Sequence, residues 1–214
     1  MQPGPHMPTK AQFGASFAGI LIMMLGTAII TRSGLGTAPV SSPVWVASLI
    51  GGLSFGGWTF VVNVCFIVAQ KLLLREAFPK HALLQLPALV VASASLDGWM
   101  WLLRFIQPNG YFMQLVTVLA GIGVLGVGVA FLAAARALFL PGEGLVSAIA
   151  DVRGVPFAKV KLPFDITCVL TALVLAFVFL HDLSVIREAT VMSALLLGPV
   201  AGLFIPALRR RLHP

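Results

Sequence analysis

Six long apolar runs constrain this chain more than any other feature of its sequence. They cover about residues 13–31, 57–74, 82–105, 111–135, 157–180 and 188–208. A helix needs about 20 mostly apolar residues to cross the hydrocarbon core of a bilayer, and each run is close to that length. The sequence therefore predicts an all-α integral membrane protein with six transmembrane helices.

The composition agrees with a membrane protein and argues against soluble classes. Of the 214 residues, 59% are hydrophobic and 10% are charged, whereas soluble domains carry about 25% charged residues. The net charge of +7 does not indicate a nucleic-acid partner, because the basic residues gather at the ends of the apolar runs. Cys65 and Cys168 lie inside apolar runs, so we expect them to be packing residues rather than a disulfide.

A polar stretch, TRSGLGTAPVSSPVW at 31–45, interrupts the apolar sequence after the first run. A short apolar piece at about 43–53 belongs to this interruption, and a second one lies at about 142–152. Each has on the order of ten residues, which suits a half-helix or a re-entrant segment rather than a span. A proline precedes each piece, and proline is favoured in the first turn of a helix.

The basic residues predict how the chain is oriented in the membrane. If both short pieces return to the side from which they enter, eleven of the 14 Lys and Arg residues lie on one side. If both pieces span, the division is about eight to six. Because Lys and Arg are enriched on the cytoplasmic side, the sequence favours six spans with both termini in the cytoplasm.

The chain contains two copies of one pattern, offset by 102 residues. Segments 20–68 and 122–170 align without a gap and share seven identities. The identical pairs are Ile20 and Ile122, Gly26 and Gly128, Ala28 and Ala130, Pro39 and Pro141, Val44 and Val146, Gly52 and Gly154, and Phe55 and Phe157. Three spans per copy predict two inverted three-helix repeats, each with a short broken or re-entrant helix.

These repeats divide the chain into four parts. We expect an N-terminal tail at 1–12, one membrane repeat at 13–106, a second at 107–208 and a basic cytoplasmic tail at 209–214. In inverted-repeat transporters the solute binds near the midplane, where interrupted helices from the two halves meet. We therefore place a candidate binding site between segments 32–53 and 134–154.

Polar residues at and near the two breaks are the candidate solute-binding residues. The first break contributes Arg32, Ser33, Gly34, Gly36, Thr37, Ser41 and Ser42; the second contributes Arg136, Gly142, Glu143 and Gly144; the spans add Asn63, Asp97 and Asp165. The start of a helix carries free N–H groups and a partial positive charge. Charged residues inside a membrane are costly and by default indicate function.

A second interpretation of these residues is structural. Gly, Ser and Thr also allow helices to approach closely and cap their ends. Arg32, Arg104 and Arg136 can extend to lipid headgroups, and Asp151 can cap a helix or pair at the surface. The stretch PFAKVKLPFD is also compatible with Asp165 near the cytoplasmic interface.

The sequence contains no pattern typical of an enzyme or a metal site. The four histidines lack metal-ligand spacing, and no nucleophile motif or phosphate-binding loop is present. GIGVLGVG at 121–128 lies inside an apolar run, where it indicates a helix-packing face. We therefore predict no catalytic residues, no metal and no cofactor.

Two elements, SGLGTAPVSSPVW and LPGEGLVSAIADVRGVPFAKVKLPFDI, resemble bacterial membrane proteins of the YczE/YitT type. The resemblance covers about residues 20–180. It implies a bacterial inner-membrane protein with five or six spans and a transport role, but no substrate and no catalytic residues. The second element departs from the pattern, because it has Glu143 and lacks an SGLG sequence.

Three functions remain open at this point. The first is a secondary transporter or facilitator for a small polar or ionic solute, in which Glu143, Asp165 and Asp97 supply charge or proton coupling. The second is a passive pore with two half-helices meeting at its centre, and the third is a non-transporting scaffold or regulatory partner. The expected partners are the lipid bilayer and the solute, with a homo-oligomer as a further expectation.

Overall fold

The six predicted spans are present in the computed structural model, which describes residues 9–135 and 140–212. All regular structure in this part of the chain is helical. The long helices are α1 (Lys10–Arg32), α3 (Phe55–Leu74), α4 (Gln85–Leu102), α5 (Tyr111–Ala135), α7 (Phe157–Leu175) and α8 (Glu188–Leu212). With the helical turns that adjoin them, six helices within the described residues are long and apolar enough to cross a membrane.

Two short helices lie where the sequence predicts interruptions. The first break contains the 3₁₀ turn η1 (Pro39–Ser41) and then α2 (Ser42–Ile50). The second short helix is α6 (Pro141–Arg153). Both have proline in the first turn, as expected.

Local sequence signals explain several helix boundaries. Thr9 caps α1 by accepting a hydrogen bond from the N–H of Gln12, whose side chain accepts one from Thr9 in return. Ser54 caps α3 by accepting from the N–H of Gly57. Gly154 ends α6 in the left-handed conformation, with φ at +63°.

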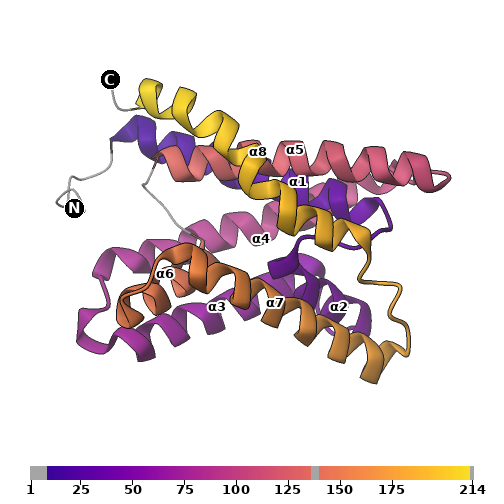
Figure 1. Cartoon of the computed structure of the whole chain (residues 1–214), viewed down its shortest axis with the longest axis horizontal. Coiled ribbons are helices and arrows are strands. Elements are labelled where there is room, and N and C mark those ends of the chain that lie inside the picture. Colours follow the sequence, from indigo (N-terminus) through magenta and orange to yellow (C-terminus); the bar gives the residue numbers. More distant parts are fainter. Residues whose placement is uncertain (1–8, 136–139, 213–214) are drawn as a thin grey trace.

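The helices form two layers that α4 connects (Figure 1). Helices α1, α5 and α8 form one layer, and α2, α3, α6 and α7 form the other. Helix α4 packs against α1 and against α3. The start of α1 and the end of α8 lie at the same end of the molecule, with α6 nearby, whereas α2 lies at the opposite end (Figure 1).

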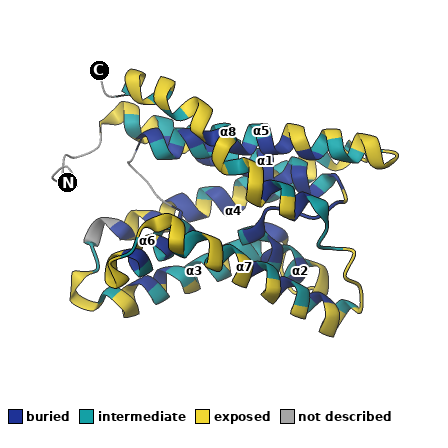
Figure 2. Cartoon of the chain, viewed as in Figure 1, coloured by how far each residue is buried: buried dark blue, intermediate teal, exposed yellow. Residues whose placement is uncertain are grey.

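The outer surface is apolar, as a lipid-facing surface must be. Figure 2 shows exposed residues along the outward faces of the helices and buried residues where the helices meet. Leu203, Phe112 and Leu72 are more than 70% exposed. A water-soluble protein seldom exposes so much contiguous apolar surface, so this distribution agrees with the membrane class.

Glycines bring α1 and α5 into close antiparallel contact. A Cβ atom on Gly26 would lie 2.6 Å from Leu125 Cα, and one on Gly128 would lie 2.7 Å from Met23 Cα. Gly128 lies 102 positions after Gly26, and Leu125 lies 102 positions after Met23. The two contacts are therefore equivalent under the predicted repeat. The contact pattern is what an inverted repeat requires, although the repeat itself stays a prediction.

Each short helix packs against a span of the other copy. Helix α2 packs against α7, and α6 packs against α3. Val46 of α2 is fully buried beside Ala172 and Ala176 at the α7 contact. The two predicted repeats are therefore interlocked rather than side by side.

The α1–α5 contact yields a stability prediction. Gly26→Ala and Gly128→Ala should each lower the stability by about 1–3 kcal/mol, because the added methyl group would overlap the backbone of the facing helix. Gly123→Ala is the matched control on α5, since its Cβ would meet nothing within 4 Å. Thermal unfolding in nanodiscs measures the difference, and equal melting temperatures for Gly26→Ala and Gly123→Ala would contradict the packing.

Candidate functional site

The starts of the two short helices meet inside the molecule. A Cβ atom on Gly142, in the first turn of α6, would lie 3.4 Å from Cγ1 of Val40 in η1 and 3.8 Å from the ring of Phe66. Val40 and Gly142 occupy the same position of the two copies, 102 residues apart. The structure thus brings the two predicted breaks together at one point.

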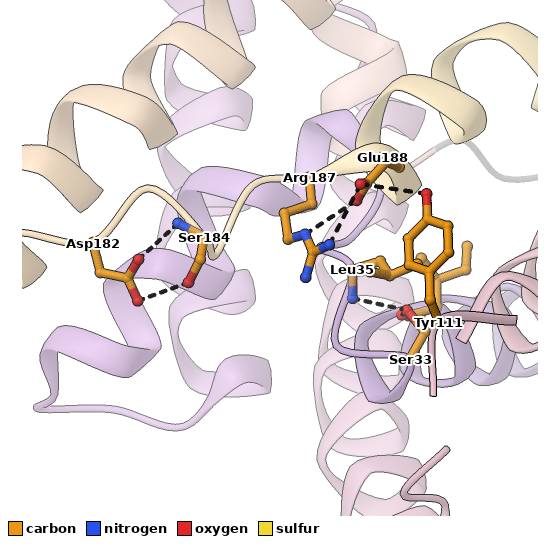
Figure 3. Close-up of polar contacts among 8 residues, drawn as sticks. Ser33, Leu35, Tyr111, Asp182, Ser184, Arg187 and Glu188 are labelled. Carbon is orange, nitrogen blue, oxygen red and sulfur yellow. Dashed lines mark hydrogen bonds and ion pairs between the residues drawn. The ribbon is translucent and has the colours of Figure 1, made fainter. Parts of the chain in front are cut away.

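The first break is held by α1 and by the start of α8. The Ser33 hydroxyl donates to the carbonyl of Ile30 and accepts from the N–H of Leu35, and the Leu35 carbonyl accepts from the N–H of Ala189 at 3.0 Å. Figure 3 shows Ser33 and Leu35 next to the segment that leads into α8. The backbone of the break is therefore paired inside the protein, as a non-helical segment in a membrane must be.

Gly36 and Thr37 lie in the buried part of this break. Gly36 has φ at +102°, and a Cβ there would lie 2.9 Å from the hydroxyl oxygen of Thr190. Hence only glycine fits this close approach. The Thr37 hydroxyl is buried and lies 2.8 Å from that of Thr31. Gly34, by contrast, is exposed.

The side chains of Ser42 and Arg32 at the first break have hydrogen-bond partners within the protein. Ser42 is buried and donates to the carbonyl of Ala38 at 3.1 Å, and Ser41 is half-buried. Arg32 donates through Nη2 to the carbonyl of Met100 near the end of α4. Its Nε is buried without a hydrogen-bond partner among the described residues. The predicted second arginine, Arg136, lies outside the described residues.

The second break carries the charged residues. Lys161 and Asp165 of α7 form an ion pair with Nζ and Oδ1 2.6 Å apart. Glu143, in the first turn of α6, is half-buried. Burial raises the pKa of Glu143, the Lys161 ammonium opposes this shift, and the Asp165 carboxylate adds to it. The charges of Lys161 and Asp165 thus act on Glu143 in opposite directions.

Asp97 and Asn63 have hydrogen-bond partners outside the two breaks. Asp97 accepts hydrogen bonds from the Ser54 hydroxyl at 2.6 Å and from the Gly56 N–H at 2.7 Å, so it caps the start of α3 from α4. The Asn63 amide donates to the carbonyl of Thr59 in its own helix at 2.9 Å. Among the residues that the structure describes, neither side chain is hydrogen-bonded to a residue of the two breaks.

Three polar residues at the second break were missed by the sequence analysis. Gln70 and Gln85 are buried next to Gly144, and Lys161 pairs with Asp165. The signal was available for the glutamines, because each is an uncharged polar side chain in or beside an apolar run. The repeat gives no signal for Gln70, because its counterpart 102 positions later is the apolar Ala172.

The segment between α7 and α8 is ordered by its own polar contacts (Figure 3). Asp182 accepts from the hydroxyl of Ser184 at 2.7 Å and from its N–H at 2.8 Å. These two hydrogen bonds, the hydroxyl one first, lower the pKa of Asp182. Glu188 pairs with Arg187 and accepts from the Tyr111 hydroxyl at 3.4 Å, which links the starts of α8 and α5.

Comparison with known proteins identifies a family that covers most of these elements. The profile of a family of unknown function, DUF6198, matches residues 10–206. The chain belongs to the DUF6198 family. The match extends from the start of α1 almost to the end of α8, so both breaks lie within the DUF6198 region.

A curated relative of this DUF6198 member comes from Bacillus subtilis (strain 168). It is the uncharacterized protein YyaS, which is 27% identical over 194 residues, covering 90% of this chain and 91% of the relative. Together with the six apolar helices, this bacterial relative indicates that the chain is a bacterial membrane protein. No solved structure matches the chain.

The role of Asp97 can be tested by stability. Asp97→Ala should lower the stability by about 1–3 kcal/mol, because the Gly56 N–H and the Ser54 hydroxyl lose their acceptor. Asp97→Asn keeps one acceptor oxygen and should lose less. Thermal unfolding of the two variants in nanodiscs measures the difference, and an unchanged melting temperature for Asp97→Ala would exclude a capping role.

Glu143 gives a prediction about pH. A carboxyl group whose pKa is higher in the folded state binds its proton more tightly there than in the unfolded chain. The stability should therefore fall as the pH rises from the ordinary pKa of Glu toward the raised value. Glu143→Gln stays neutral and should unfold at a higher temperature than the wild type at neutral pH. Melting curves over a pH series measure this, and a less stable Glu143→Gln would refute it.

Proposed function

We propose that this protein moves a small polar or ionic solute across the bacterial inner membrane, as a secondary transporter or facilitator. The observation that carries the proposal is the contact between Val40 and Gly142, where the starts of two short helices meet. Two inverted repeats with interrupted helices are a recurrent design of transporters. The resemblance to YczE/YitT-type proteins implies a transport role, whereas the family model that matches the chain, DUF6198, is of unknown function.

The point where the two short helices meet, at Val40 and Gly142, suits a polar solute. Both short helices direct their first turns toward it, and the first turn of a helix carries unpaired N–H groups and a partial positive charge. The first break adds the hydroxyls of Thr37 and Ser42, and the second adds the carboxyl group of Glu143. The solute would thus meet backbone N–H donors and hydroxyl oxygens on one side, since the Ser42 hydrogen is donated to the carbonyl of Ala38, and an ionisable carboxyl group on the other.

The charged cluster supplies a means of coupling. Glu143 lies close enough to Lys161 and Asp165 for their charges to act on it. Burial raises the pKa of Glu143, and a carboxyl group with a raised pKa in a binding site is a candidate for proton uptake and release. Protonation of Glu143 would change the charge of the cluster and, with it, the affinity for an ionic solute.

The distribution of basic residues supports cytoplasmic termini. The starts of α1 and α7 and the ends of α3 and α8 lie at one end of the molecule (Figure 1). These helices carry Lys10, Lys159, Lys161, Lys71, Arg209, Arg210 and Arg211 there. Because Lys and Arg are enriched in the cytoplasm, we assign this end to the cytoplasmic side.

Flux measurements test the proposal. Wild-type protein in proteoliposomes should take up members of a panel of radiolabelled amino acids, sugars and inorganic ions, and imposed pH gradients should change the rate. Asp165→Asn and Glu143→Gln should abolish the gradient-dependent part while the protein stays folded. Asp151→Asn is the matched control, because Asp151 is an exposed carboxylate on α6.

Other outcomes distinguish the alternatives. Flux that does not saturate and does not respond to the pH gradient would indicate a passive pore. Gradient-dependent flux that is equal in Asp165→Asn and the wild type would remove Asp165 from the site. No flux for any member of the panel would favour a scaffold or regulatory partner.

A further inference from the structure

Two buried glutamines connect the first copy to the start of α6. Gln70 of α3 is 3% exposed and Gln85 of α4 is 7% exposed. The Nε2 of Gln70 donates to the Gln85 side-chain oxygen at 3.2 Å and to the carbonyl of Pro141 at 2.9 Å. The Nε2 of Gln85 donates back to the Gln70 side-chain oxygen at 3.3 Å.

The energetic reason for this arrangement is the environment. An amide buried in a membrane span without hydrogen-bond partners is energetically costly, so each glutamine needs the other. Gln70 uses both of its N–H donors, one of them on the backbone of α6. The Gln70–Pro141 hydrogen bond therefore ties the position of α6 to that of α3 and α4.

Gly144 makes the close approach possible. A Cβ atom there would lie 2.8 Å from the side-chain oxygen of Gln70 and 3.0 Å from the Nε2 of Gln85. Any larger residue would push the two amides away from α6. Gly144 thus lies against the two glutamines, whereas the charges of Lys161 and Asp165 act on its neighbour Glu143.

The first short helix is fixed by different means. The residue that corresponds to Gly144 is Ser42, whose hydroxyl donates to the carbonyl of Ala38 four residues earlier. The counterpart of Gln70 is Ala172, which packs against Val46 of α2. Hence the start of α2 is held locally and by apolar packing, whereas the start of α6 is held by a side chain from another helix.

We infer that Gln70 and Gln85 are positioning residues, which hold the first turn of α6 and so set the place of Glu143 at the meeting point of the short helices. Gln70 acts directly on Pro141, two residues before Glu143. Gln85 acts through Gln70. Movement of α3 and α4 is thereby transmitted to Glu143. This inference rests on the proposed function for the role of Glu143, but the contact itself is independent of any solute.

Hydrogen–deuterium exchange in nanodiscs tests the contact without a solute. Gln70→Leu should accelerate exchange of the Gly144 amide, which is hydrogen-bonded to the Leu140 carbonyl in the first turn of α6, on the order of tenfold, because the Pro141 carbonyl loses a buried hydrogen bond. Gln85→Leu removes only the indirect support and leaves the Gln70–Pro141 bond, so it should accelerate exchange less than Gln70→Leu does. Unchanged exchange in folded Gln70→Leu, or equal acceleration in both variants, would overturn the inference.

A second variant keeps the test decisive if Gln70→Leu does not fold. Gly144→Ala retains both glutamines and pushes them from α6, so it should also accelerate exchange in the first turn. Unchanged exchange in folded Gly144→Ala would overturn the inference as well. Gly98→Ala on α4 is its control, because a Cβ there would meet nothing within 4 Å.

The titration of Glu143 separates positioning from mere stability. The carbonyl infrared band that disappears in Glu143→Gln reports protonated Glu143. Its midpoint should shift to lower pH in Gln70→Leu, because a loosened first turn admits water, and should shift less in Gln85→Leu. An identical midpoint in wild type and Gln70→Leu would overturn the positioning role. If Glu143→Gln leaves the gradient-dependent flux unchanged, the coupling role proposed for Glu143 fails, while the exchange result still decides the contact.

Discussion

The need to pair every backbone polar group inside hydrocarbon governs the structure of this protein. Six continuous helices satisfy this need internally, but the two breaks cannot. At the first break, Ser33 and the start of α8 supply partners for the backbone between Ile30 and Leu35. At the second, Gln70 supplies a donor to Pro141. The rest of the packing follows from placing these partners within reach.

The chemical difference between the breaks follows from their partners. The first break is surrounded by hydroxyls and apolar side chains, and its short helix packs on Ala172 and Ala176. The second is flanked by two glutamines on one side and by an ion pair on the other. The two breaks therefore have unlike surroundings, and of the two short helices only α6 carries a carboxyl group in its first turn.

Much of the fold was predictable because membrane spans depend on length and hydrophobicity. The predicted span at 111–135 coincides with α5, and the short pieces at 43–53 and 142–152 correspond to α2 and α6. The site was less predictable. Asp97 is a carboxylate in a span, which indicates function by default, yet its partners Ser54 and Gly56 are 43 and 41 residues away in the sequence. Such pairs depend on helix rotation, which hydropathy does not determine.

The contact between Gln70 and Pro141 was likewise not predictable from the sequence. Nothing in the sequence near Gln70 indicates Pro141, which lies 71 residues later. The repeat predicted that the breaks would be related, and the contact of Val40 with Gly142 agrees with it. The repeat gave no information about Gln70, because a comparison based on identical residues does not report positions, such as Gln70 and Ala172, at which the two copies differ.

The interlocking of the short helices has a consequence for biosynthesis. Helix α2 packs against α7, which the ribosome produces more than a hundred residues later. Until α7 enters the bilayer, the first half of the nascent chain has a break whose final neighbours do not yet exist. Membrane insertion of this protein therefore cannot be completed one span at a time. The first break reaches its final packing only after α7 has been synthesised and inserted.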